Sequence, residues 1–240
     1  MDFGIVIIWM QGKLMHIEIL VEDSSGKKAL EILVPKIIGS EHTIRFHEYK
    51  GIGRIPKNLK GKPDPSKRIL LQRLPKLLQG YGNAFSRFPP DYHAAVVLVC
   101  DLDDKNIKVF KNELLAILSA CSKKPKTRFC FAIEEGEAWF LGDLSAIKRA
   151  YPKAKQSILN SYASDSICGT WEVLADALYP GGAKTLKEGG YQKAGAEKYQ
   201  WAEKISPHMK VENNTSPSFC YFRDQLRELT ATHSASTILN

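Results

Sequence analysis

Three apolar runs bounded by turn residues stand out in the hydrophobic pattern, at residues 16–21, 94–100 and 127–133, with a fourth candidate strand at 43–49. Runs of this length are typical of strands buried on both faces of a parallel sheet. Segments with apolar residues at helical spacing lie between them, at 27–38, 66–78 and 107–121, the second bent at Pro75. This alternation predicts an α/β fold, a mostly parallel sheet flanked by helices.

The pattern becomes helical after residue 134, with candidate helices at 135–141, 144–150, 171–178, 198–205 and 217–229. We therefore predict a core at 15–142 and a helical C-terminal extension at 143–240 that packs on it. Residues 1–14 are interpreted as an N-terminal extension or an extra strand. Trp139 and Trp201 are expected in the core, and Ser216 is expected to cap the last helix.

Acidic residues follow three of the strand candidates: Glu22, then Asp101 and Asp103, then Glu135 and Glu137. The carboxyl ends of parallel strands meet at one edge of a sheet, so these side chains are expected to converge. Two carboxylates about 4 Å apart repel by roughly 4 kcal/mol at an effective dielectric near 20. A divalent cation would neutralise this repulsion.

Glu134 and Asp143 are further candidates for the same cluster. A simpler interpretation of the Glu134–Glu135 pair is that it favours the N-terminus of the helix ending near Leu141.

The chain has a net charge of +8. The excess of positive charge is concentrated between residues 45 and 87, which contain eleven Lys or Arg and only two acidic residues. The Gly-, Pro- and Lys-rich insertion at 50–66 predicts an exposed loop. Two interpretations of this loop stay open. It binds the phosphodiester backbone of a substrate beside a metal site, or it is a solvated surface loop without a binding role. The candidates for nucleic-acid binding are Arg54, Lys57, Lys60, Lys62, Lys67 and Arg68.

Composition narrows the class of protein. With 240 residues and 44% hydrophobic residues, the chain is long enough for one substantial core. The apolar stretch 3–10 is too short to span a bilayer, and Asp2 argues against a secretory leader. The five cysteines form no C-x-x-C pair, so we expect neither a structural zinc site nor a disulfide framework. We expect a cytoplasmic protein with no membrane partner.

The order of the acidic clusters, a Glu after the first strand, Asp-x-Asp after a later one and Glu-x-Glu after the next, resembles the TOPRIM domains of topoisomerases, primases and OLD (overcoming lysogenisation defect) nucleases. The segments EEGEAWFLGD, YQKAGAEKYQWAEKISPHM and NNTSPSFCYFRDQL resemble a stand-alone bacterial TOPRIM family known only as a domain of unknown function. The resemblance covers about residues 15–229. Members are often encoded beside an ATPase.

This resemblance implies a TOPRIM or Rossmann-like core and a nuclease that depends on Mg²⁺ or Mn²⁺. Glu22, Asp101 and Asp103 would bind the metal, and Glu135 and Glu137 would supply a second metal site. Lys193 would stabilise the transition-state phosphate, as a late-chain lysine does in OLD-like enzymes. The implied context is an anti-phage or mobile-element system with a separately encoded ABC- or AAA-type ATPase, and a homo-oligomer is possible.

One position departs from the OLD-like pattern, and it keeps a second interpretation open. Those enzymes carry an acidic residue four positions after the first Glu, where this chain has Gly26. Asp23 is a poor substitute, because its position on a strand points elsewhere. The alternative function is a catalytically weak nucleic-acid-binding or regulatory subunit of an ATPase complex.

A third interpretation comes from the same residues, because VVLVCDLDD also resembles the nucleophile motif of haloacid-dehalogenase-type phosphatases. Lys105 and Asn106 then depart from that family's pattern.

Overall fold

Four parallel strands form one sheet in the order β2-β1-β3-β4. The computed structural model describes residues 14–56, 67–167 and 169–231, so the predicted extension at 1–13 and most of the basic insertion lie outside the described residues. The strands are β1 (Met15–Val21), β2 (Thr43–Glu48), β3 (His93–Asp101) and β4 (Thr127–Ala132). The predicted α/β class, with a parallel sheet flanked by helices, is confirmed.

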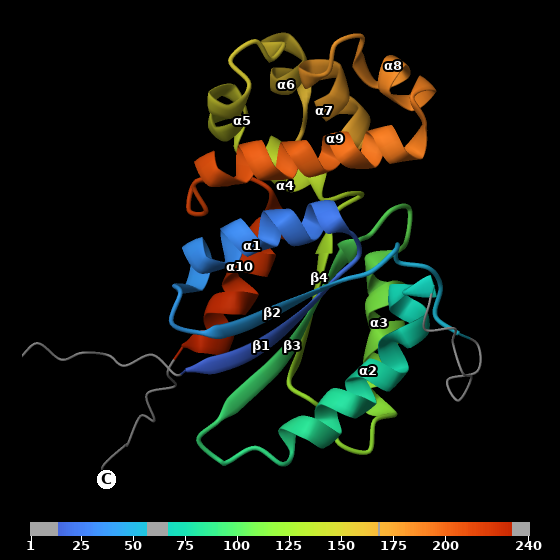
Figure 1. Ribbon diagram of the computed structural model, residues 1–240, viewed down its shortest axis with the longest axis vertical. Helices are drawn as coiled ribbons and strands as arrows, with labels where there is room; N and C mark the ends of the chain where they lie inside the picture. Colours follow the sequence, from blue (N-terminus) through green and yellow to red (C-terminus); the bar gives the residue numbers. More distant parts are fainter. Residues whose placement is uncertain (1–13, 57–66, 168, 232–240) are drawn as a thin grey trace, which may run out of the picture.

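Helices cover both faces of the sheet, which explains why its strands are apolar on both sides (Figure 1). Ile17 and Ile19 of β1 pack in the same cluster as α1 (Ser24–Ile38). Leu20 points to the opposite face, where α2 (Leu70–Phe85) and α3 (Ile107–Ser119) complete a second apolar cluster. All seven residues of β1 are buried.

The central strands β1 and β3 pair in parallel, with Val21 opposite Val99. The chain leaves β1 toward β2 on one side and leaves β3 toward β4 on the other. The carboxyl ends of β1 and β3 therefore form the switch point of the sheet, where open α/β sheets bind their ligands.

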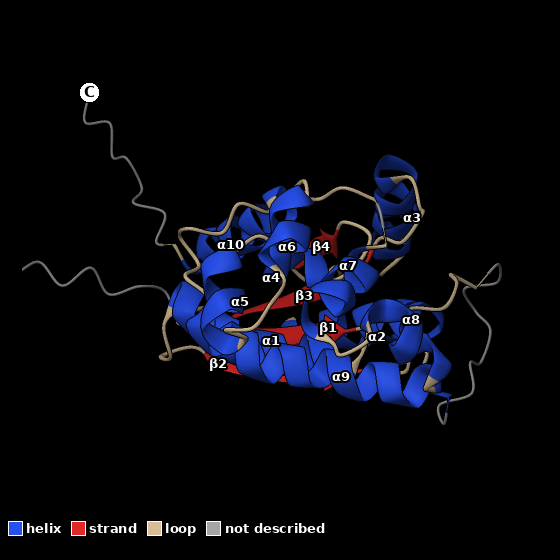
Figure 2. Ribbon diagram, turned by 90° about the horizontal axis from the view of Figure 1, so that it is seen from above, coloured by secondary structure: helices blue, strands red, loops and turns tan. Residues whose placement is uncertain are grey.

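The region after β4 is helical, as predicted, and shares one apolar core with the sheet and α1. Figure 2 shows α9 lying along α1, while α10 packs on β4. Trp201, Phe219 and Phe222 are fully buried in this core. Its elements are α4 (Glu137–Leu141), α5 (Leu144–Ala150), α6 (Gln156–Ser161), α7 (Thr170–Leu178), α8 (Gly182–Glu188), α9 (Gly190–Ile205), the 3₁₀ turn η2 (Ser206–His208) and α10 (Pro217–Thr230).

Helices α6 and α8 have no predicted counterpart, and two helices, α2 and α9, differ from their predicted boundaries by four residues or more. Helix α2 begins at Leu70, where the carbonyls of Gly51 and Ile52 accept the first N–H groups of the helix, and it continues through Pro75 to Phe85. Helix α9 begins at Gly190, eight residues before the predicted start at 198, because packing on α1 and α8 outweighs the low helix propensity of its glycines. In the ranges that the structure describes, no helix is both long and apolar enough to cross a bilayer.

Candidate active site

A cavity of about 50 Å³ opens at the carboxyl edge of the sheet, between the ends of β1 and β3 and the N-termini of α1 and α4. Four carboxylates from three separate stretches of sequence are among its lining residues: Glu22, Asp23, Asp101 and Glu137. The edge of the sheet thus brings together a member of each predicted acidic cluster.

Glu22 and Asp101 form the centre of this site. One carboxylate oxygen of Glu22 accepts the backbone N–H of Asp101 at 3.2 Å. Burial raises the pKa of Glu22 to about 7, and the charges of Asp103 and Asp23 add to the effect. Burial and the neighbouring Glu22 also hold the pKa of Asp101 well above its usual range. These two carboxyls are crowded at a point where a cation would favour their charged forms.

Asp103 lies close to this pair but does not continue the strand. Its φ of 50° turns the backbone into the left-handed region, and its N–H donates to the carbonyl of Glu134 at 3.0 Å. The side chain pairs with Lys105. Asp101 and Asp103 therefore do not project from one side of an extended strand, although the charge of Asp103 still acts on Glu22.

Glu135 and Glu137 share a lysine that sequence reasoning missed. Lys198 of α9 places its ammonium 3.6 Å from Glu135 and 3.2 Å from the buried Glu137. Burial alone would lower the pKa of Lys198, but Glu137, Glu135 and Asp101 raise it above its usual range. Burial raises the pKa of Glu135 to about 7 despite this lysine. No local sequence signal links α9 to residues sixty positions earlier.

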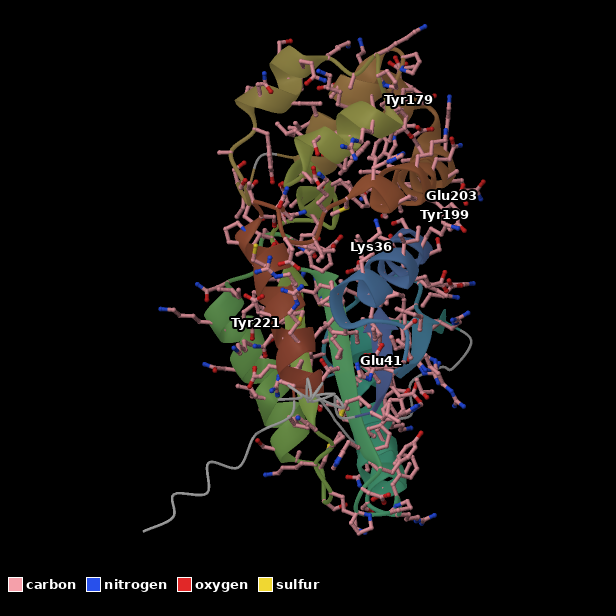
Figure 3. All side chains as sticks on the ribbon, turned by 90° about the vertical axis from the view of Figure 1, so that its left-hand side faces the viewer. Lys36, Glu41, Tyr179, Tyr199, Glu203 and Tyr221 are labelled. Carbon is pink, nitrogen blue, oxygen red and sulfur yellow. The ribbon has the colours of Figure 1, made fainter. Side chains whose placement is uncertain are left out.

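Lys193 lies elsewhere on α9. It is exposed, and its ammonium stands 5.7 Å from the ring centre of Tyr179, at the upper end of the molecule in Figure 3. It stands in the first turn of α9, before the start of the helix predicted at 198–205. In the described part of the chain, Lys198 is the lysine of this helix that contacts the acidic residues.

The further acidic candidates have structural partners. Glu134 accepts the backbone N–H groups of Gly169 at 2.9 Å and Thr170 at 2.8 Å, and Glu135 accepts that of Trp171 at 3.0 Å. This pair therefore caps the N-terminus of α7, not that of the helix ending at Leu141. Asp143 caps α5 through the N–H of Ala146 at 3.0 Å.

The structure also accounts for Gly26. Asp23 is the N-cap of α1, and its carboxylate accepts the N–H of Gly26 at 2.7 Å. A Cβ atom at position 26 would lie 2.9 Å from Cγ1 of Val21. Any side chain at this position would have to displace the side chain of Val21, so close packing favours glycine here.

Two carboxylates of the acidic site, Glu22 and Asp101, are candidates to hold a metal ion. Among the described residues, no three His, Cys, Asp or Glu side chains converge as a ligand set for a metal ion. The donor chemistry of Glu22 and Asp101 does fit a hard divalent cation, which prefers carboxylate oxygens. Their crowding also fits, because both pKa values are raised where a cation would lower them.

We call residues 50–68 the basic segment, and its two ends are anchored beside Glu22. The N–H of Gly51 donates to the carbonyl of Glu22 at 3.1 Å, and the N–H of Lys50 donates to that of Arg68 at 2.9 Å. Arg54, Lys67 and Arg68 are exposed at these ends. The other predicted nucleic-acid-binding residues, Lys57, Lys60 and Lys62, lie outside the described residues.

Comparison with protein-family models, with curated proteins and with solved structures found no match to this chain. The TOPRIM resemblance stays a prediction.

Proposed function

We propose that the protein is a nuclease that hydrolyses phosphodiesters with the help of Mg²⁺ or Mn²⁺. The observation that carries the proposal is the contact of Glu22 with Asp101 at the switch point of the sheet, where both carboxyls have raised pKa values. The anchoring of the basic segment beside Glu22 supports a polyanionic substrate.

Glu22 and Asp101 would hold the cation, and Asp103 would join them once its carboxylate leaves Lys105. A bound divalent cation supplies positive charge at the phosphate and lowers the pKa of a bound water. Lys198 stands across the acidic site, where a fixed ammonium stabilises charge on phosphate oxygens. We assign to Lys198 the role that the family resemblance gave to Lys193.

The biological setting rests on the family resemblance alone. We propose an effector of an anti-phage or mobile-element defence system, controlled by a separately encoded ATPase and acting in the cytoplasm.

A second function, a nucleic-acid-binding or regulatory subunit, is favoured by one observation. Lys198 already neutralises Glu135 and Glu137, which the resemblance assigns to the second metal. Together with Gly26, this arrangement supports one metal site in place of two. If one metal is not enough for cleavage, the protein would bind nucleic acid without hydrolysing it.

The test is cleavage of duplex DNA, single-stranded DNA and a structured RNA in Mg²⁺, Mn²⁺ or EDTA. The proteins are wild type, Asp101→Asn and Asp91→Asn, in which the same change is made in the exposed loop before β3. We expect cleavage with metal by wild type and the Asp91 variant, and none by the Asp101 variant. Metal-dependent binding without cleavage would support the regulatory subunit, and equal cleavage by all three would exclude this site.

A further inference from the structure

A second cavity, of about 310 Å³, is lined by residues of α7, of α8 and of the first turns of α9. These three helices lie in the upper part of the molecule in Figure 1. Its lining residues are Trp171, Lys187, Gly190, Tyr191 and Ala194. Tyr191 is 99% exposed, so both faces of its ring are free. An open aromatic ring at the edge of a cavity is a surface on which an unpaired base can stack.

This cavity adjoins the acidic site through two shared residues. The backbone N–H of Trp171 donates to Glu135 at 3.0 Å. The ammonium of Lys198 lies 3.2 Å from Glu137 and 5.8 Å from the ring centre of Trp171. One lysine therefore faces both the carboxylates and the indole, and a group bound against Trp171 would be a close neighbour of a phosphate at the site.

Lysine side chains flank the aromatic rings, and two of these lysines, Lys187 and Lys198, also pair with carboxylates. The ammonium of Lys187 stands 5.4 Å from the ring centre of Trp171 and is held there by Glu172 at 2.9 Å. Lys193 lies over Tyr179 on the adjoining turn of α9. Flat apolar faces ringed by ammonium groups match a nucleotide, whose base stacks while its phosphates meet the charges. They match an apolar peptide less well.

We propose that this cavity binds an unpaired nucleobase of the strand that is cleaved. The inference rests on the proposed nuclease function and specifies its substrate class: a single strand, or a looped region whose base next to the reacting phosphate has left its stack. Tyr191 supplies an open stacking face, and Trp171 forms the inner wall of the cavity. A base within a perfect duplex has both faces covered and is not available for this stacking.

The test measures binding alone, in the Asp101→Asn protein without divalent cations. Fluorescence anisotropy would follow a labelled single-stranded 12-mer, the same 12-mer with abasic residues, and its duplex. Tyr191→Ala should weaken binding of the intact single strand about tenfold, as expected for the loss of one base–aromatic stack. Binding of the abasic strand and of the duplex should change less than twofold.

Two further variants separate stacking from other effects. Tyr191→Phe should bind the single strand like the parent, because the ring is kept, and Tyr221→Ala on α10, whose ring is 42% exposed, should also leave binding unchanged. Equal losses on intact and abasic strands, or a parent that does not bind the single strand, would overturn the proposal. Tyr191-dependent binding with no cleavage by wild type would instead reject the nuclease and keep the base-binding site.

Discussion

The carboxylate of Glu22 accepts the backbone N–H of Asp101 at 3.2 Å, which ties together the ends of the two central strands. Val21 lies opposite Val99 in the sheet, so the parallel register brings Glu22, one residue further on, and Asp101, two residues further on, to the same edge. The contact therefore follows directly from the pairing of β1 with β3, and it concentrates negative charge where a cation is most favourable.

The raised pKa of Glu22 predicts how stability depends on pH when no divalent cation is present. Its pKa moves from an ordinary value of 4.5 to about 7. Because the folded protein holds this proton more tightly than the unfolded chain, stability falls as pH rises from 4.5 to 7. Glu22→Gln should remove part of this loss and stabilise the protein at pH 8, by about 1 kcal/mol.

Thermal unfolding at pH 5 and pH 8 in EDTA would check this prediction, with Glu113→Gln on the exposed side of α3 as the control. A smaller difference between the two pH values is expected for the Glu22 variant only. If both variants follow the wild-type curve, Glu22 has no unusual pKa.

Lys198 should contribute strongly to the stability of the fold at pH 8. Lys198→Met leaves Glu135 and the buried Glu137 without their cation, and breaking such a pair costs about 3 kcal/mol. The loss should be smaller at pH 5, where Glu135 is protonated, since its pKa is about 7. Urea denaturation at pH 8 and pH 5 would measure both values.

Two comparisons identify the cause of any loss. Lys204→Met, on the exposed side of α9, should change stability by less than about 0.5 kcal/mol. Adding Glu137→Gln to Lys198→Met should recover part of the loss, because the uncompensated charge is removed. A double variant as unstable as the sum of the two single changes would mean that Lys198 acts through packing alone.

The basic segment should set the salt dependence of nucleic-acid binding. Replacing Arg54, Lys57, Lys60 and Lys62 with Ala should weaken binding about equally for all sequences. It should also flatten the salt dependence, by up to about 0.9 log units for each phosphate of duplex DNA that the protein no longer neutralises. Binding of a labelled duplex and a structured RNA would be measured across a salt series. A control with the same number of changes would replace the exposed lysines Lys123, Lys124, Lys153 and Lys155.

Identical slopes for wild type and the basic-segment variant, on both substrates, would show that this segment is only a solvated surface. Equal flattening by the control would show that net charge, and not this segment, governs binding.

Local pattern and strand direction were sufficient to predict the sheet and the meeting of Glu22 with Asp101. Apolar runs identify buried strands, and a parallel sheet places their ends at one edge. The capping of α7 by Glu134 and Glu135 could not be predicted, because the N–H groups that donate to these carboxylates lie some 35 positions later in the sequence.

Lys198 was missed for a similar reason. The role of Lys198 depends on where α9 packs against the rest of the fold. The glycines at the start of α9 also made its first residue unpredictable from helix propensity. Lys193, chosen from a family pattern, lies more than one turn earlier on the same helix, beside Tyr179.

The central claim is that Glu22 and Asp101 hold a divalent cation, and calorimetric titration with Mn²⁺ at pH 7 tests it most directly. We predict that each wild-type chain binds one ion. Binding should release protons, because Glu22 has a pKa of about 7 and must lose its proton to hold the cation. Repeating the titration in buffers of different ionisation enthalpy would detect this release. Asp101→Asn should weaken binding at least tenfold, and Asp91→Asn should not. Absence of Mn²⁺ binding by wild type at millimolar concentration, or equal binding by the Asp101 variant, would contradict the account.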